Sequence, residues 1–261
     1  MSVPSDLDWL GLERHGEGAW SFELTGPLSR FDGKFYGGTG IAVTTALLEA
    51  ETERAALWAT VQFAGTANVG DRIDCHVEVL ARGRRTAQVR MTASVGDQVM
   101  LAAIGASGDP RAGEISAQFG AMPDVGSPED APPWRPNTPF PVDFERPSWL
   151  QLAELREVLA PKGPRLLWAR LRDRPQTRAS LGFLADMVPS AVVQAAGRAG
   201  AGTSLDNAMR FGPEPATDWI LVDFDPYFVA SGYAHGGARI WSTDGTLLAI
   251  ASQTATLLLF D

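Results

Sequence analysis

The chain contains two similar segments, and this internal repeat limits its fold more than any other feature. Residues 57–106 resemble residues 204–253 in their order of strand-like runs and turns, at an offset of 147 positions that aligns Asp97 with Asp244. A repeat of this length indicates two copies of one folding unit. Because the copies differ at polar positions, we expect one structural half and one half that carries the chemistry.

A proline-rich segment separates the two copies. Nine of the 18 prolines lie within residues 109–147, where they cannot sustain a helix or a central strand. We therefore expect an N-terminal unit over residues 1–108 and an extended surface connector over 109–147. The C-terminal unit, residues 148–261, is the candidate catalytic half.

Both halves show the same order of predicted elements. In the first half, the pattern predicts a strand at 18–24, a helix at 39–52, and strands at 57–64, 72–82, 84–95 and 98–107. In the second half, it predicts a hairpin of 150–158 and 165–172 that is closed by a turn at 161–164. An apolar helix at 180–197 follows, which Pro189 interrupts or begins. The predicted strands after this helix are 204–211, 219–229, 231–242 and 246–259. A helix that is apolar on nearly all sides must be covered on all sides. We therefore expect an α+β fold in which each half wraps an antiparallel sheet around a long central helix.

Composition and charge exclude several classes of function. The net charge is −9 and the basic residues are scattered, which argues against a nucleic-acid-binding protein. No apolar run reaches the length of a membrane-spanning helix, and the N-terminus lacks the pattern of a secretory signal. The single cysteine, Cys75, fits a reducing compartment, so we expect a cytoplasmic protein. The histidines are dispersed and no nucleotide-binding loop is present, so neither a metal site nor a cofactor is expected.

Several short strings, taken in their order and spacing, resemble one protein family. They are Phe35-Tyr36-Gly37-Gly38 and Gly83-Arg84 in the first half, and LGFLAD at 181–186, SLDNAMRF at 204–211 and DGTLLA at 244–249 in the second. On these strings the chain is similar, over nearly its whole length, to the double hotdog proteins of the acyl-CoA thioesterase II type. The resemblance implies a tandem hotdog whose halves pair within one chain, and an acyl-CoA or related thioester as substrate. It is also compatible with a homodimer.

The resemblance also implies a set of working residues. In that family, an Asp, a Thr or Ser, and a Gln of the second half form a triad. The Asp falls on Asp186, the Gln falls on Gln253, and an ungapped count between Trp219 and Asp244 puts the hydroxyl position at Tyr227, where a longer phenol replaces it. The candidate substrate-binding or orienting residues are Gly37, Gly38, Asp206 and Asn207.

These residue types suit thioester hydrolysis. Asp186, expected at the start of a buried helix, could act as a general base with a raised pKa, and Gln253 could hold the water or the carbonyl. Backbone N–H groups in the first turn of that helix could stabilise the oxyanion. The structural alternatives are a helix cap for Asp186, an outward strand position for Gln253 and a packing role for Tyr227.

Three readings of the function follow from the resemblance. The preferred one is an acyl-CoA thioesterase-like hydrolase. A rival is a non-catalytic protein that binds acyl groups or acyl-CoA and has lost the triad hydroxyl, since Tyr227 stands at that position. A third is an enzyme like the enoyl-CoA hydratases of the hotdog fold.

Overall fold

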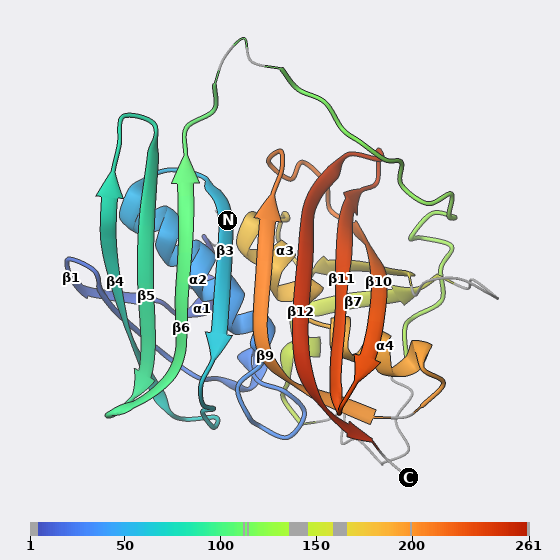
Figure 1. Cartoon of the computed structure of the whole chain (residues 1–261), viewed down its shortest axis with the longest axis horizontal. Helices are drawn as coiled ribbons and strands as arrows, with labels where there is room; N and C mark the ends of the chain where they lie inside the picture. Colours follow the sequence, from blue (N-terminus) through green and yellow to red (C-terminus); the bar gives the residue numbers. More distant parts are fainter. Residues whose placement is uncertain are drawn as a thin grey trace.

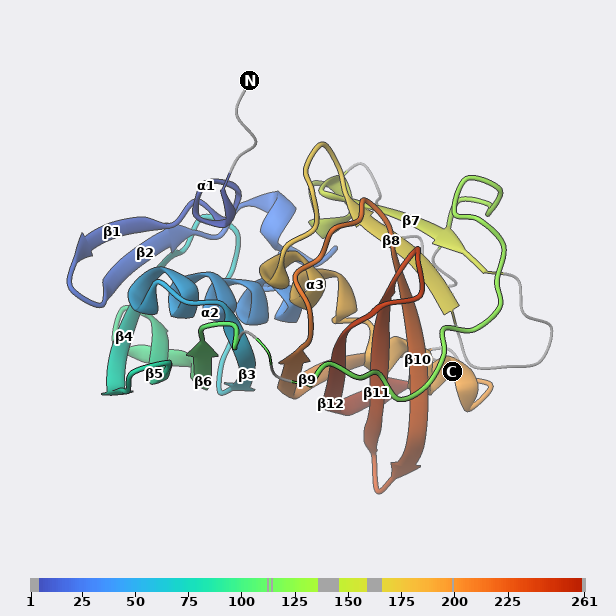
Figure 2. The same ribbon diagram turned by 90° about the horizontal axis from the view of Figure 1, so that it is seen from above.

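A continuous antiparallel sheet of twelve strands runs through the described part of the chain and curls around the helices (Figures 1 and 2). The computed structural model describes residues 5–111, 113, 115–135, 146–158, 166–198 and 200–259. The strand order is β1-β2-β4-β5-β6-β3-β9-β12-β11-β10-β8-β7. The first six strands in this order come from the first half of the chain, and the last six come from the second.

The predicted strands and helices occur in the predicted order, and the structure adds a short helix and a short strand near the N-terminus and two 3-10 helices. The first half comprises α1 (Asp6–Leu10), β1 (Glu13–Gly16), β2 (Ala19–Glu23), η1 (Gly26–Leu28), α2 (Gly37–Thr52), β3 (Ala56–Phe63), β4 (Arg72–Arg82), β5 (Thr86–Val95) and β6 (Gln98–Gly108). The second half comprises η2 (Trp149–Gln151), β7 (Ala153–Glu157), β8 (Leu166–Leu171), α3 (Arg178–Ala185), α4 (Val188–Ala195), β9 (Gly200–Phe211), β10 (Ile220–Ala230), β11 (Tyr233–Ser242) and β12 (Leu247–Leu259). The predicted turn at 161–164 lies outside the described residues.

The two halves join through one pair of strands. Strand β3 pairs antiparallel with β9, from Trp58 opposite Arg210 to Gln62 opposite Asp206. Because every strand between the outer edges then has two neighbours, the halves form one sheet rather than two separate ones. The two halves therefore pair within one chain, as expected for a tandem hotdog.

Helix α2 is the central helix of the first half, and it is buried almost throughout. Its four buried threonines would be costly if their hydroxyl groups had no partner. Thr39 donates to the carbonyl of Leu28 in η1. Thr44 donates to the carbonyl of Gly40, Thr45 to that of Ile41, and Thr52 to that of Leu48, each four residues earlier. The helix can therefore carry these polar residues inside an apolar core.

The second half has two short helices where the sequence pattern predicted one helix at 180–197. Helix α3 ends at Ala185, and α4 begins at Val188 with Pro189 in its first turn. Proline has no N–H to bond the carbonyl four residues earlier, here that of Ala185. The N–H of Met187 donates to that carbonyl instead, at 2.7 Å. The interruption by Pro189 is thus confirmed, and it leaves Asp186 at the break between the helices.

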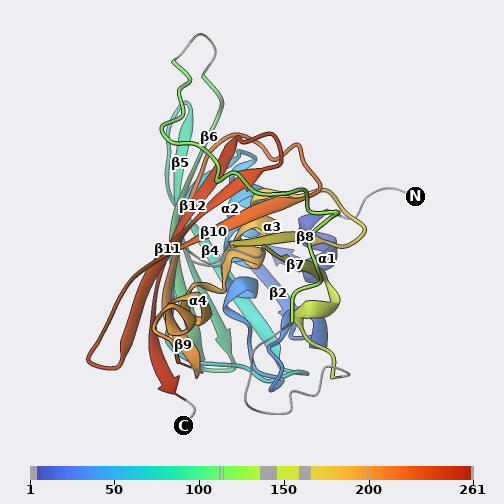
Figure 3. The same cartoon turned by 90° about the vertical axis from the view of Figure 1, so that its right-hand side faces the viewer.

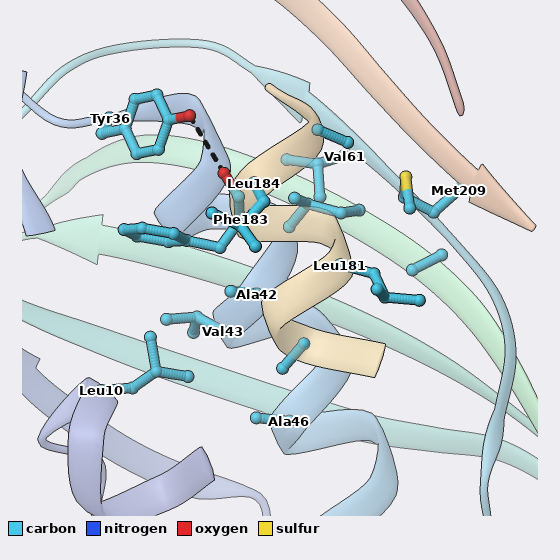
Figure 4. Close-up of a cluster of buried hydrophobic side chains, with 14 of the residues drawn as sticks. Leu10, Tyr36, Ala42, Val43, Ala46, Val61, Leu181, Phe183, Leu184 and Met209 are labelled. Atoms are coloured by element: carbon cyan, nitrogen blue, oxygen red, sulfur yellow. Dashed lines mark hydrogen bonds between the residues drawn. The ribbon is translucent and has the colours of Figure 1, made fainter. Parts of the chain in front are cut away.

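Helices α2 and α3 cross closely in the core beside the junction of the two halves (Figure 4). A Cβ on Gly182 would lie 3.0 Å from the side chain of Ile41, so glycine permits this approach. The buried Tyr36, just before α2, donates its hydroxyl proton to the carbonyl of Phe183 at 3.0 Å. These contacts hold the N-terminus of α2 against the C-terminal end of α3.

The described part of the connector has neither helix nor strand between residues 115 and 135, and it runs along the second half (Figure 3). It covers a separate apolar cluster on the second half. That cluster consists of Leu166, Trp168, Trp219, Leu221 and Trp241, with Met122, Val125 and Ala131 of the connector packed against it. The indole N–H of Trp168 donates to the carbonyl of Gly126 at 3.0 Å, and this hydrogen bond fixes the connector on the cluster.

Candidate functional site

Asp186 lies where the second half meets the first. It caps the C-terminus of α3 with φ −76° and ψ 45°, so the prediction that it begins a helix is wrong. Its carboxylate lies against the N-terminus of α2, where it accepts a hydrogen bond from the backbone N–H of Gly38. A Cβ on Gly37 would lie 2.6 Å from Asp186 Oδ2, so only glycine allows the helix to come this close. A helix N-terminus is a favourable place for a negative charge.

Two amides of the second half hold one oxygen of this carboxylate. Gln253 Nε2 donates to Asp186 Oδ1 at 2.5 Å, and Asn207 Nδ2 donates to the same oxygen at 3.1 Å. Gln253 on β12 and Asn207 on β9 are direct register partners, so their side chains leave the same face of the sheet. Both residues are buried. The structural alternative of an outward strand position for Gln253 is therefore wrong, since Gln253 points toward the helices.

A short hydroxyl completes this group of side chains. Gln253 Nε2 also donates to Ser204 Oγ, at 2.7 Å. Ser204 reaches this position through a β-bulge, because Thr254 pairs with Asp206 while the next residue, Ala255, pairs with Ser204. The unopposed Leu205 shifts the alternation of the strand by one residue. Asp186, Gln253 and Ser204 thus form one hydrogen-bonded line.

Burial raises the pKa of Asp186 from its ordinary value to about 7. Asp186 keeps part of its surface accessible, but its carboxyl group is enclosed by protein atoms, which disfavours the charged form. The hydrogen bonds from Gln253, Asn207 and the Gly38 N–H oppose this effect, as does the positive charge of Arg30. Desolvation is the larger effect, and the carboxyl group titrates near neutral pH.

Two buried acceptors beside the carboxylate have no donor among the described residues. These are Gln253 Oε1 and Asn207 Oδ1, and each belongs to an amide whose nitrogen donates to Asp186. The carboxylate can only accept, so it fixes the orientation of both amides. An unpaired buried acceptor is costly, and groups of this kind are typical of sites that bind a donor.

Comparisons with known proteins identify the family to which the chain belongs. Residues 24–108 match the acyl-CoA thioesterase N-terminal domain, and residues 123–257 match the acyl-CoA thioesterase C-terminal domain. The chain belongs to the acyl-CoA thioesterase family. The search of curated proteins found no match.

Solved structures share the fold of this family member over nearly its whole length. A protein from Novosphingobium aromaticivorans, provisionally described as a thioesterase, is 29% identical with a TM-score of 0.85, and the match covers 95% of this chain and 98% of that one. A hotdog-fold protein from Alicyclobacillus acidocaldarius is 22% identical with a TM-score of 0.84, covering 98% and 99%. An acyl-CoA thioesterase II from Mycobacterium marinum is 20% identical with a TM-score of 0.77, covering 98% and 99%. The tandem hotdog architecture is thus confirmed.

Tyr227 does not lie in the site, and the prediction that put it at the hydroxyl position of the family triad is wrong. Its side chain is 56% exposed, on the β10–β11 hairpin that extends beyond the rest of the sheet (Figure 2). A Cβ on Gly237 would lie 2.5 Å from the Tyr227 hydroxyl oxygen. A Cβ on Gly236, the register partner of Gln253, would instead contact Val188 and Val192 of α4. Successive strand residues face opposite sides, so Tyr227 lies on the outer face and Gln253 on the inner face.

Asp206 is also separate from the site of this thioesterase family member. It precedes the inward-facing Asn207, so its side chain leaves the opposite face of β9. Its carboxylate accepts the backbone N–H of Thr254 at 2.7 Å, next to the bulge. The role predicted for Asp206 in substrate binding is therefore wrong, and the residue stabilises the irregular strand pairing. Of the predicted site residues, the structure brings together Asp186, Gln253, Asn207, Gly37 and Gly38.

Other features of the described residues add no second site for this chemistry. No group of three His, Cys, Asp or Glu side chains in the described ranges could hold a metal ion. A cavity of about 410 Å³ lies beside α1 and β2, lined by residues that include Trp9, Phe22 and Arg72, and Asp186 is not among its lining residues. No helix in these ranges is long and apolar enough to cross a membrane.

Proposed function

We propose that the protein hydrolyses acyl-CoA thioesters by attack of water, with Asp186 as the general base. The observation that carries this proposal is the hydrogen-bonded line of Asp186, Gln253 and Ser204 at the N-terminus of α2. It combines a carboxylate that titrates near neutral pH, an amide that orients it and a short hydroxyl within one partly buried cluster.

The reaction proceeds in two steps. Asp186 takes a proton from a water molecule, whose oxygen forms a bond to the thioester carbonyl carbon and leaves a tetrahedral oxyanion. The oxyanion then collapses and the carbon–sulfur bond breaks. The protonated Asp186 returns its proton to the sulfur, so the products are a carboxylic acid and free thiol. A base whose pKa lies near the working pH is well suited to take up and return a proton in one cycle.

Ser204 and Gln253 position the reacting groups. The Ser204 oxygen already accepts from Gln253, which leaves its own proton free to donate to the water or to the substrate carbonyl. Gln253 Oε1, without a donor among the described residues, can accept a proton of the water. Both groups are pre-oriented before substrate arrives, and this reduces the entropy cost of reaching the transition state.

The first turn of α2 supplies the electrostatic part of the mechanism. N–H groups at the start of a helix have no acceptor within the helix, and the helix dipole favours negative charge there. The close approach allowed by Gly37 and Gly38 lets a developing oxyanion lie near this end of α2. In this mechanism, the first half of the chain contributes backbone groups to the site.

The non-catalytic alternative was based on the loss of the triad hydroxyl at Tyr227. Ser204 provides a short hydroxyl at 2.7 Å from Gln253, so the structure offers no observation that favours this alternative. The rival predicts tight binding of acyl-CoA without turnover, and it remains an outcome of the test below.

Replacing Ser204 with alanine tests the assignment. We expect kcat for the release of free CoA from acyl-CoA to fall by about 100-fold or more, because the variant loses a group that positions the reacting atoms in a desolvated site. Tyr227→Phe is the matched control, because it also removes one hydroxyl group, and it should retain kcat within about twofold. Thermal unfolding of both variants shows whether they fold. Normal kcat in Ser204→Ala together with a large loss in Tyr227→Phe would reverse the assignment, and binding of acyl-CoA without turnover by the wild type would support the rival.

A further inference from the structure

Three basic residues lie on two segments next to the N-terminus of α2. Arg30 and Lys34 belong to the loop that precedes the helix, and Arg146 belongs to the segment that precedes η2, far away in the sequence. A Cβ on Gly33 would lie 2.3 Å from Arg146 Nη2, so the guanidinium of Arg146 lies directly on the loop. Gly33 also has φ +76°, a conformation that favours glycine. We call Arg30, Lys34 and Arg146 the basic cluster.

Buried contacts fix the two segments that carry the basic cluster. The backbone N–H of Trp149 donates to the carbonyl of Ser29 at 2.8 Å. The Trp149 ring stacks on Tyr36 with the centroids 4.9 Å apart and the planes 6° apart. Tyr36 in turn bonds the carbonyl of Phe183, three residues before Asp186. The same contacts therefore position the basic cluster and the candidate base.

The basic cluster is locally positive in an acidic protein. The chain has a net charge of −9, and Lys34 is one of its two lysines. Arg30 forms an ion pair with Asp32, from Nη2 to Oδ2 at 2.5 Å. Within the described ranges, neither the Lys34 ammonium nor the Arg146 guanidinium has a carboxylate partner. Both side chains are exposed, so they are free to bind an anion.

The basic cluster lies within reach of the candidate active site. Lys34 precedes Gly37 by three residues, so their Cα atoms are at most about 11 Å apart. The charge of Arg30 also acts on Asp186, whose pKa it helps to lower. A ligand that contacts both the basic cluster and Asp186 needs an anionic end and a flexible neutral arm that carries the thioester.

We propose that Arg30, Lys34 and Arg146 bind the phosphate groups of coenzyme A while its pantetheine arm extends to Asp186. This inference rests on the proposed function and assigns the residues that recognise the phosphate groups of its substrate. Guanidinium and ammonium groups are the side chains that bind phosphates best. Because these side chains lie at the surface, their effect is on substrate capture, and it weakens as salt screens the charges.

The experiment compares one acyl group on two carriers. The double variant Lys34→Ala/Arg146→Ala is assayed with acyl-CoA and with the same acyl group on pantetheine, which lacks every phosphate. We expect kcat/KM for acyl-CoA to fall at least tenfold, mostly through KM, and the salt dependence of KM to weaken. With acyl-pantetheine, kcat/KM should stay within about twofold of the wild type. Arg85→Ala, an exposed arginine between β4 and β5, is the control and should leave both substrates unaffected.

Failure of this inference is distinguishable from failure of the proposed function. If the wild type cleaves neither substrate, the proposed function is wrong. If it cleaves both and the double variant keeps wild-type kcat/KM for acyl-CoA, the basic cluster does not bind the phosphates. Calorimetric titration with CoA needs no turnover, and it should show at least tenfold weaker binding to the double variant. Equal affinity for CoA in the two proteins would contradict the inference.

Discussion

Replacing Asp186 with asparagine is expected to lower kcat for acyl-CoA hydrolysis by about 100- to 10,000-fold, the usual contribution of a general base. Asparagine has nearly the shape of aspartate, but it cannot take a proton from water at neutral pH. Release of free CoA under saturating substrate measures the effect. The loss should appear with any acyl chain length, because the base acts on water rather than on the acyl group.

Asp223→Asn is the matched control for this substitution. Asp223 is also buried with a raised pKa, again because burial disfavours its charge, but it lies on β10 opposite Arg239 and away from the candidate site. It should retain wild-type kcat if its thermal unfolding shows a folded protein. Activity of Asp186→Asn within tenfold of the wild type would mean that another group is the base.

Asp186 should also make the folded protein less stable as the pH rises. Its pKa is about 7 in the folded state and about 3.8 as a free side chain. Well below pH 3.8 both states hold the proton. Between pH 4 and 7 the unfolded chain releases the proton while the folded chain keeps it, so the free energy of unfolding decreases, by up to about 4 kcal/mol. Above pH 7 the contribution becomes constant.

Urea unfolding of the wild type and Asp186→Asn at several pH values measures this contribution. The other ionisable groups are common to both proteins, so the difference between their unfolding free energies isolates Asp186. We expect Asp186→Asn to gain stability relative to the wild type as the pH rises from 4 to 7, with little further change up to pH 8. A difference that does not vary with pH would show that Asp186 has an ordinary pKa in the folded protein.

The fold was largely predictable from local patterns. Strands such as Arg72–Arg82 alternate buried and exposed residues over most of their length, and the largely buried helix at Gly37–Thr52 has a sheet around it as expected. The break between α3 and α4 follows from one residue, Pro189, which cannot donate a backbone hydrogen bond. These features depend on residues that are close in sequence, which is why the pattern reveals them.

The hydroxyl of the site was not predictable in the same way. Strict alternation along β9 would place Leu205 on the face of Asn207, with Ser204 on the other face. The bulge at Leu205 reverses this, and no glycine or proline in SLDN marks it. The ungapped count selected Tyr227, which lies on β10, two strands away from β12. Strand β9, which carries Ser204, pairs with β12 directly. The string SLDNAMRF was the available signal, because its first residue is Ser204.

The role of the first half depends on a contact that sequence alone could not establish. Gly37 and Gly38 precede Asp186 by almost 150 positions, and the pairing of β3 with β9 brings them together. Their contribution to substrate binding stays a prediction, as does the division of the chain at residues 109–147. The possible homodimer also stays a prediction.

The pH dependence of kcat/KM for acyl-CoA tests the central claim most directly, because it reports the ionisation of the free enzyme. The carboxylate is the active form of Asp186, whose pKa is about 7. We predict that kcat/KM rises about tenfold per pH unit between pH 5 and 6.5 and levels off above pH 7.5. A profile that is flat from pH 5 to 8 would contradict a general base at Asp186.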